Sequence, residues 1–303
     1  MRLLLIRLAC LIATFGMATH ANSQAETEPN DSKAAADAFL LPGASTTAVI
    51  VGNSTSATGA GLDYFRASVP SRATPGFYRH RLVVTSATPG HTLTIRGLQQ
   101  LSGFITDVDV AVQTSDAGTT PQRFVQWYTT ETGGDVYIRL TGAAATTSNY
   151  SLDYEVASVP IAAGPTIEIG ARIVRTTNAT SADTDLWIYD GNRIAIPGLG
   201  NDDVSQSSSQ SAINRTWSAG IYFVVVSDFN LANNLASPPE DFYRDANVLD
   251  FPGVLAQSTT LTGVLLPLDI EANLVTLTKT EPYEIKFVRF VVAETPRFRN
   301  GFE

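Results

Sequence analysis

Residues 26–32, which read ETEPNDS, form a dense set of oxygen-bearing side chains near the start of the chain. Calcium takes about six to eight oxygen ligands and prefers carboxylates mixed with amide and backbone oxygens. In an extended segment Glu26, Glu28 and Asn30 point to the same side, so their oxygens can converge on one ion. The stretch is therefore one candidate for a structural calcium site. The alternative is a solvated acidic segment whose last residues only form a turn and cap a helix.

A second acidic set surrounds a predicted hairpin further along the chain. Its Gly-Asn-Asp-Asp loop lacks the regular ligand spacing and the final glutamate of an EF-hand. Acidic and amide side chains are also common in turns, where they bond the nearby backbone. We therefore expect turn chemistry here, with calcium as the alternative. The set comprises Asp183, Asp185, Asp190, Asn201, Asp202 and Asp203.

Aromatic side chains offer a possible binding face. Trp187 and Tyr189 alternate with apolar residues and so share one face of a predicted strand. If that face is exposed, it would suit a sugar ring or a peptide, because Trp and Tyr side chains combine a large apolar area with a polar N–H or O–H group. The alternative is that both faces of the strand are buried between two layers.

Support for catalysis is weak. His20 lies in the N-terminal leader, which leaves His80 and His91, and neither is part of a His-Glu-x-x-His motif. The chain has no Gly-x-Ser-x-Gly elbow. An extracellular hydrolase remains the alternative function, because a triad or a carboxylate pair can be assembled in space from distant residues. His80 or His91 beside a serine and an aspartate would favour it.

Composition points to a β-rich extracellular protein. The chain has 303 residues, of which 44% are hydrophobic and only 16% charged, and its formal net charge is −9. An acidic surface argues against nucleic-acid binding, which needs a basic one. Residues 1–25 have the layout of a secretory signal peptide, with cleavage expected after Ala21 or Ala25. The single cysteine, Cys10, lies within it, so we expect a mature chain without disulfides. No later segment is apolar enough to span a bilayer, so we also expect no membrane span in the mature chain.

Short runs rich in β-branched and aromatic residues, separated by Gly, Pro and Asn turns, predict an all-β fold. One or two helical turns are expected first, at residues 33–39, capped by Ser32 or Asp31. Strands are expected at residues 46–51, 62–69, 78–85, 91–95, 108–112, 124–129, 135–140, 150–156, 166–174, 186–189, 193–196, 221–227, 259–268, 274–278 and 283–292.

This spacing favours two jelly-roll-like antiparallel β-sandwich units. We place the first at residues 26–157 and the second at 166–293, joined by a linker at 158–165 and followed by a mobile tail at 294–303. The second unit repeats features of the first, since an acidic strand start and a later Gly-led strand occur in both. Duplication is one explanation; the general similarity of antiparallel strands is the other.

Several of these motifs together resemble the bacterial pre-peptidase C-terminal domain family. The opening residues 28–35, the Asp63-Tyr64-Phe65 stretch, the Asp-x-Asp strand at residues 107–109 and the closing Tyr150-Ser151-Leu152 carry the resemblance. It covers residues 26–156 well and residues 165–292 loosely. The family implies a small β-sandwich, a non-catalytic appendage of secreted enzymes, although no peptidase domain accompanies it here.

The resemblance also implies a ligand set for calcium. Collagen-binding members of the family bind calcium through an N-terminal segment completed by an Asp-Tyr pair on a later strand. The matching residues are Glu26, Glu28, Asn30, Asp31, Asp63 and Tyr64. Ala60 stands where that subfamily has another acidic ligand, so we expect one ion or none instead of two.

We therefore expect a secreted, non-catalytic binding or adhesion module. Its partner would be an extracellular polysaccharide or protein, held through strand-face aromatics and loops, with Ca²⁺ as a structural ion. The hydrolase described above is one alternative. A structural cell-surface protein is another, and exposed unpaired edge strands would be its sign.

Overall fold

Strands dominate the structure, which is a computed structural model. In the part that it describes, the only helix is the short 3-10 helix η1 (Lys33–Ala35), and the rest of the regular structure is β, so the all-β prediction is confirmed. The described residues are 22–40, 47–53, 62–86, 91–101, 104–115, 122–142, 149–177, 182–205, 207–228, 231–235, 246–249, 253–256 and 262–294. The predicted signal residues 1–21 and tail residues 295–303 lie outside these ranges.

Two sheets form the first unit. Sheet A has the order β1 (Asn22–Ala25), β3 (Thr47–Asn53), β10 (Asn149–Ser158), β5 (Phe77–Ser86), β8 (Gln122–Thr130), β19 (Val254–Ala256), β17 (Leu231–Asn233). Sheet B has the order β18 (Ala246–Leu249), β6 (Thr92–Leu101), β9 (Gly134–Thr141), β4 (Leu62–Val69), β2 (Asp37–Leu40), and β7 (Phe104–Thr114) pairs with β6. The strands alternate buried and exposed side chains, as a sheet with one covered face requires.

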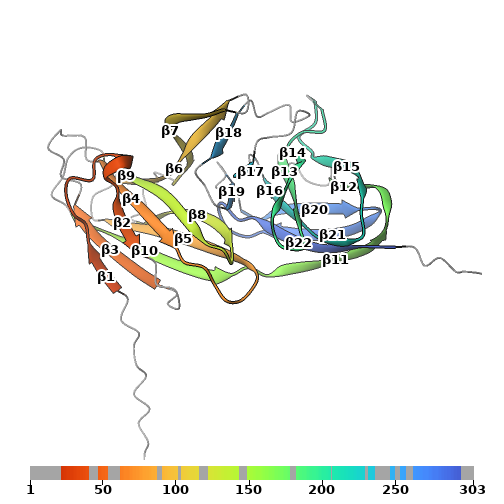
Figure 1. Cartoon of the computed structure of the whole chain (residues 1–303), viewed down its shortest axis with the longest axis horizontal. Coiled ribbons are helices and arrows are strands. Elements are labelled where there is room, and N and C mark those ends of the chain that lie inside the picture. The colour runs from red at the N-terminus through yellow and green to blue at the C-terminus, as the bar shows by residue number, and fades with distance from the viewer. Residues whose placement is uncertain are drawn as a thin grey trace, which may run out of the picture.

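Two more sheets form the second unit. Sheet C has the order β11 (Ile161–Glu168), β22 (Lys286–Ala293), β16 (Gly220–Asp228), β13 (Thr184–Asp190), β14 (Ala195–Asn201). Sheet D has the order β15 (Ala212–Trp217), β12 (Gly170–Thr176), β20 (Val264–Ile270), β21 (Asn273–Lys279). Figure 1 shows the two units side by side along the long axis of the molecule.

Each unit has its own hydrophobic core between its two sheets. In the first, Leu82 and Trp127 of sheet A face Phe65 and Ile138 of sheet B. In the second, residues of β13, β16 and β22 face residues of β12 and β20. Most strand pairs are antiparallel as predicted; among the described strands, the parallel exceptions are β1 with β3, β2 with β4, and β11 with β22.

The boundary between the units differs from the prediction. Residues 158–165 were expected as a linker, yet only Val159 and Pro160 separate β10 from β11. Strand β11 is an edge strand with a register shift between Ala163 and Thr166, and such a place tolerates Pro165 because no ladder hydrogen bond is needed there. The expected linker is therefore largely part of sheet C.

The start of the fold also differs from the prediction. Residues 22–25, assigned above to the signal peptide, form β1 and pair in parallel with β3. Cleavage after Ala21 would leave this strand in the mature protein, whereas cleavage after Ala25 would remove it. The expected helix is shorter than predicted: Ser32 caps η1, its hydroxyl accepting from Ala35 N–H at 3.3 Å, and β2 begins at Asp37.

The two units pack directly on each other through a third apolar cluster, here called the inter-unit seam. The chain returns from the second unit to the first, where β19 pairs with β8 and β18 pairs with β6 (Figure 1). The seam consists of Phe77, Tyr128, Trp187, Tyr189, Phe223, Val225, Leu231, Val254, Ile285 and Phe287. Two groups of ion pairs join the units: Glu281 with Arg79 and Arg81, and Glu131 with Arg193.

Candidate functional site

The N-terminal acidic segment is fastened to both sheets of the first unit. Glu26 N–H donates to the carbonyl of Val51 on β3 at 3.2 Å, and Tyr64 N–H of β4 donates to the carbonyl of Asn30 at 2.9 Å. These two contacts place the segment beside the Asp63-Tyr64 pair of β4.

Asp63 and Asn30 are the centre of this site. Both residues are fully buried, with 0% of their surface exposed. Neither carboxylate oxygen of Asp63, nor the oxygen or nitrogen of the Asn30 amide, forms a hydrogen bond of normal geometry. Buried polar groups in proteins are nearly always bonded, because leaving one unsatisfied costs about 1–3 kcal/mol. A calcium ion could be coordinated by these unbonded carboxylate and amide oxygens.

The electrostatics of Asp63 support the same interpretation. Burial raises the pKa of Asp63 to about 7, and the nearby carboxylates of Glu26, Glu28 and Asp31 raise it further, while the Tyr150 hydroxyl opposes the shift. Burial likewise raises the pKa of Glu26. A bound cation would stabilise all of these carboxylates in their charged form.

Glu26 is held in place by neighbouring groups. Asn53 N–H donates to its Oε1 at 2.6 Å, and the Tyr150 hydroxyl donates to its Oε2. Gly52 leaves the room that this carboxylate occupies, because a Cβ built there would lie 2.3 Å from Glu26 Cδ. Tyr150 was not predicted as a site residue, although its motif was noted, because its strand lies more than a hundred positions away in the sequence.

The remaining predicted calcium ligands lie near Asp63 and Asn30, but not all of their side chains face this site. Glu28 Oε2 accepts from Asn30 N–H at 3.1 Å, and Asp31 has one buried oxygen without a hydrogen-bond partner. Tyr64 follows Asp63 directly on β4, so its side chain points to the opposite face and only its backbone adjoins the site. The structure thus brings together the acidic segment and Asp63, with Asn30 between them.

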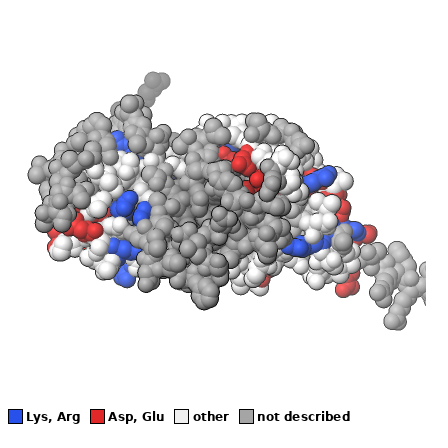
Figure 2. Space-filling view, turned by 90° about the horizontal axis from the view of Figure 1, so that it is seen from above, with Lys and Arg blue, Asp and Glu red and all other residues white. Residues whose placement is uncertain are grey.

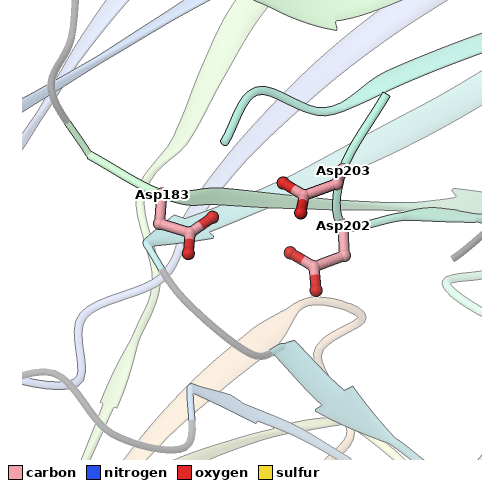
Figure 3. Close-up of side chains that lie close together, drawn as sticks. All are labelled: Asp183, Asp202 and Asp203. Carbon is pink, nitrogen blue, oxygen red and sulfur yellow. The ribbon is translucent and has the colours of Figure 1, made fainter. Parts of the chain in front are cut away.

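The tightest acidic cluster lies elsewhere, in the second unit. Among the described residues, three acidic side chains have ligand atoms within 4.8 Å of one another only at Asp183, Asp202 and Asp203. The antiparallel pairing of β13 and β14 explains this, because it brings the residue before β13 beside the residues after β14 (Figure 3). Burial raises the pKa of Asp183 to about 6, with Asp203 and other nearby aspartates adding to the effect.

In the rest of this acidic set, Asp190 forms a local turn of the expected kind, whereas Asn201 and Asp185 accept hydrogen bonds from distant backbone segments. Asp190 Oδ1 accepts from the N–H groups of Asn192 and Ile194 at 2.8 and 2.9 Å. Asn201 Oδ1 accepts from Ala212 N–H at 2.7 Å. Asp185 accepts a hydrogen bond from the backbone N–H of Leu231.

Trp187 and Tyr189 do not form an exposed face. Their surfaces are 2% and 5% exposed, because this side of β13 packs into the inter-unit seam while Leu186 and Ile188 pack into the core of the second unit. The alternative that both faces of the strand are buried is therefore the one found. Tyr189 packs edge-on against Phe77 of the first unit, with ring centroids 5.8 Å apart.

Both histidines are buried and serve the fold. His80 Nδ1 lies 2.6 Å from the Tyr154 hydroxyl and its Nε2 lies 2.8 Å from Thr129 Oγ1, and burial lowers its pKa to about 3. His91 Nδ1 lies 2.9 Å from Ser86 Oγ at the β5–β6 connection. Both partners are almost fully buried, at 5% and 1% exposed, and Ser86 also lines a pocket between the ends of β3, β5 and β10.

The surface adds little to these observations. On the face drawn in Figure 2, the coloured basic and acidic side chains form small separate groups. In the described part of the chain, no helix has the length and apolar character needed to cross a membrane.

Comparison with known proteins gives no family assignment. No protein-family model matches the chain, and no curated protein matches it. Among solved structures, it is similar to the pre-peptidase C-terminal domain of a collagenase from Bacillus anthracis, at 13% identity. That match covers 40% of this chain and 94% of the domain, with a TM-score of 0.26, which is too low to support an argument.

Proposed function

We propose that this chain is a secreted, non-catalytic binding or adhesion module that holds an extracellular polymer or protein partner. In this proposal one calcium ion binds Glu26, Glu28, Asn30, Asp31 and Asp63, with the backbone at Tyr64. The ion is structural, and it fastens the N-terminal segment to β4. The buried and structural roles of His80 and His91 favour a binding module over the hydrolase.

One observation carries the calcium proposal. Asp63 and Asn30 are fully buried, and their polar side-chain atoms form no hydrogen bond of normal geometry, although the Tyr150 hydroxyl lies beside Asp63. Burying a carboxylate and an amide without hydrogen-bond partners lowers the stability of a fold, unless a bound ligand interacts with them. Calcium matches this set because it takes oxygen ligands of mixed type in a flexible arrangement.

The test is thermal unfolding of the mature protein, first in EDTA and then with calcium added back. A ligand that binds only the folded state stabilises it by about 2.7 kcal/mol at a hundredfold excess over Kd. We expect a clear calcium-dependent rise in Tm for the wild type and none for Asp63→Asn. The control, Asp135→Asn, removes an exposed carboxylate on β9 and is expected to keep the rise. Equal Tm values in EDTA and in millimolar calcium would overturn the calcium proposal.

A further inference from the structure

A lysine and an aspartate face each other in the interior of the second unit. Asp228 ends β16 in sheet C, and Lys279 ends β21 in sheet D. The Nζ atom of Lys279 lies 2.6 Å from Asp228 Oδ1 and 2.9 Å from Oδ2, so the amine is next to the carboxyl carbon that joins these oxygens. The contact therefore connects the two sheets that enclose the core of this unit.

This pair is shielded from water. Lys279 has 0% of its surface exposed and Asp228 has 1%. Two residues beside Asp228, Thr184 across the sheet and Ser227 along the strand, are fully buried as well. Two opposite charges in such a place destabilise a fold when their loss of hydration exceeds their mutual attraction. A reaction that removes both charges would relieve this destabilisation.

Lysine is a rare choice of cation in this chain. The sequence has three lysines, Lys33, Lys279 and Lys286, among 20 basic residues. Among the described residues most ion pairs use arginine, including those that join the two units. Arginine keeps its proton and can bind a carboxylate through two parallel hydrogen bonds, so it suits a purely structural pair. Lysine differs because its amine can lose a proton and then act as a nucleophile.

The surroundings of Lys279 favour this change in its amine. Burial lowers the pKa of Lys279, although Asp228 and Glu284 oppose the shift. A proton can then pass from Nζ to the adjacent carboxylate, which leaves a neutral amine beside a carboxylic acid. These are the two groups that condense to an amide.

We propose that Lys279 and Asp228 form an intramolecular isopeptide bond, which is an amide between the two side chains. The lone pair of Nζ attacks Cγ of Asp228, the N–C bond forms, and the bond from Cγ to one carboxylate oxygen breaks. That oxygen leaves as water with two protons from the former ammonium group, so the step needs no oxidant or other reactant. Both charges are lost, and the exclusion of bulk water protects the amide from hydrolysis.

This bond gives the second unit a crosslink without cysteine. The only cysteine of the chain, Cys10, lies in the predicted signal peptide. Secreted proteins commonly use disulfides as crosslinks, which stabilise the fold by restricting the unfolded chain. Here the amide ties β16 to β21 across 51 positions of the sequence. The inference depends neither on the calcium ion nor on the proposed binding function.

The test is mass spectrometry of the denatured mature protein, with its N-terminus established by a peptide map. We expect the wild-type mass to be lower than the sequence mass by one water. Trypsin does not cleave after an acylated lysine, so the digest should contain a branched peptide that joins the segments of Asp228 and Lys279. A wild-type mass equal to the sequence mass, with an unmodified Lys279 in the digest, would overturn the proposal.

Two variants and a matched control locate the loss of water. Lys279→Met and Asp228→Ala each remove one reacting group and should have their full sequence mass. Lys286→Met is the control, because Lys286 also contacts a carboxylate, that of Glu284, but is partly exposed, and this variant should keep the loss. A mass deficit that persists in Lys279→Met would place the water loss elsewhere and overturn the proposal. The wild-type digest decides the question even where a variant fails to fold.

Discussion

Asp63 illustrates how much a single side chain can depend on its setting. An aspartate on an exposed strand would be charged and solvated, but here the same residue is buried beside Glu26, Glu28 and Asp31. Local spacing predicted that Glu26, Glu28 and Asn30 share one side of an extended chain, whereas Asp63 was added only through the family resemblance. Tyr150 could not be assigned a role from the sequence, since its contact with Glu26 depends on the pairing of β10 with β3.

The calcium-free protein should lose stability as pH rises through the titration of Asp63. Its pKa is raised from 3.8 to about 7 in the folded state, so the folded state binds the proton more tightly than the unfolded chain does. The stabilisation is fully present below pH 3.8 and is lost as pH rises to about 7. The total effect is at most about 4 kcal/mol, since one pKa unit corresponds to about 1.4 kcal/mol.

Urea unfolding in EDTA, at about pH 5 and about pH 8, measures this difference. Asp63→Asn cannot titrate at this position, so its free energy of unfolding should fall less across the same interval. Glu26 also makes the free energy of unfolding fall as pH rises, in the wild type and in the variant alike, because its pKa is raised too. The informative quantity is therefore the difference between the variant and the wild type, and parallel curves would show that Asp63 does not titrate in this range.

At the scale of single elements, β13 is the strand whose surroundings the sequence could not predict. Its alternation of aromatic and aliphatic residues was recognised, but alternation alone does not say whether the second face meets solvent or another layer. In the structure one face packs in the core of the second unit and the other in the inter-unit seam. The partner of that second face belongs to the first unit, far away in the sequence.

The close approach of β14 to Trp187 on β13 predicts a sensitive glycine. A Cβ at Gly200 would lie 2.3 Å from Trp187 Cε3, a distance that forces the buried indole to move. Overpacking of this kind costs about 1–3 kcal/mol, so Gly200→Ala should lower the free energy of unfolding by that amount. Gly220→Ala on β16 is the matched control, because a Cβ there meets Tyr222 at an ordinary 3.5 Å. Urea unfolding compares the two, and similar stability of both variants would contradict the proposed contact.

For the whole molecule, the sequence predicted two β-sandwich units but not how they are joined. Local patterns locate strands, yet they do not show that β18 and β19 cross back to pair with β6 and β8 of the first unit. The expected linker also gave no indication of the aromatic seam and the two groups of ion pairs that connect the units. These contacts join residues from opposite halves of the chain, and no local pattern encodes such pairings.

The seam predicts that the two units unfold together. Phe77 of the first unit packs on Phe287 and Phe223 of the second, with ring centroids 4.3 and 5.5 Å apart, and it is almost fully buried. Phe77→Ala should cost about 3–5 kcal/mol, as large-to-small changes of buried aromatics do. Because that loss falls on the contact between the units, calorimetry should show one transition in the wild type and two in the variant.

Phe39→Ala distinguishes loss of coupling from simple loss of stability. Phe39 is equally buried, but it lies in the core of the first unit and packs on Tyr154, away from the seam. Phe39→Ala should lower Tm by a similar amount but keep a single transition. The inter-unit seam is intact in this variant, so the loss of stability in the first unit is shared by the second. Two transitions in the wild type, or a single transition in Phe77→Ala, would show that the seam does not couple the units.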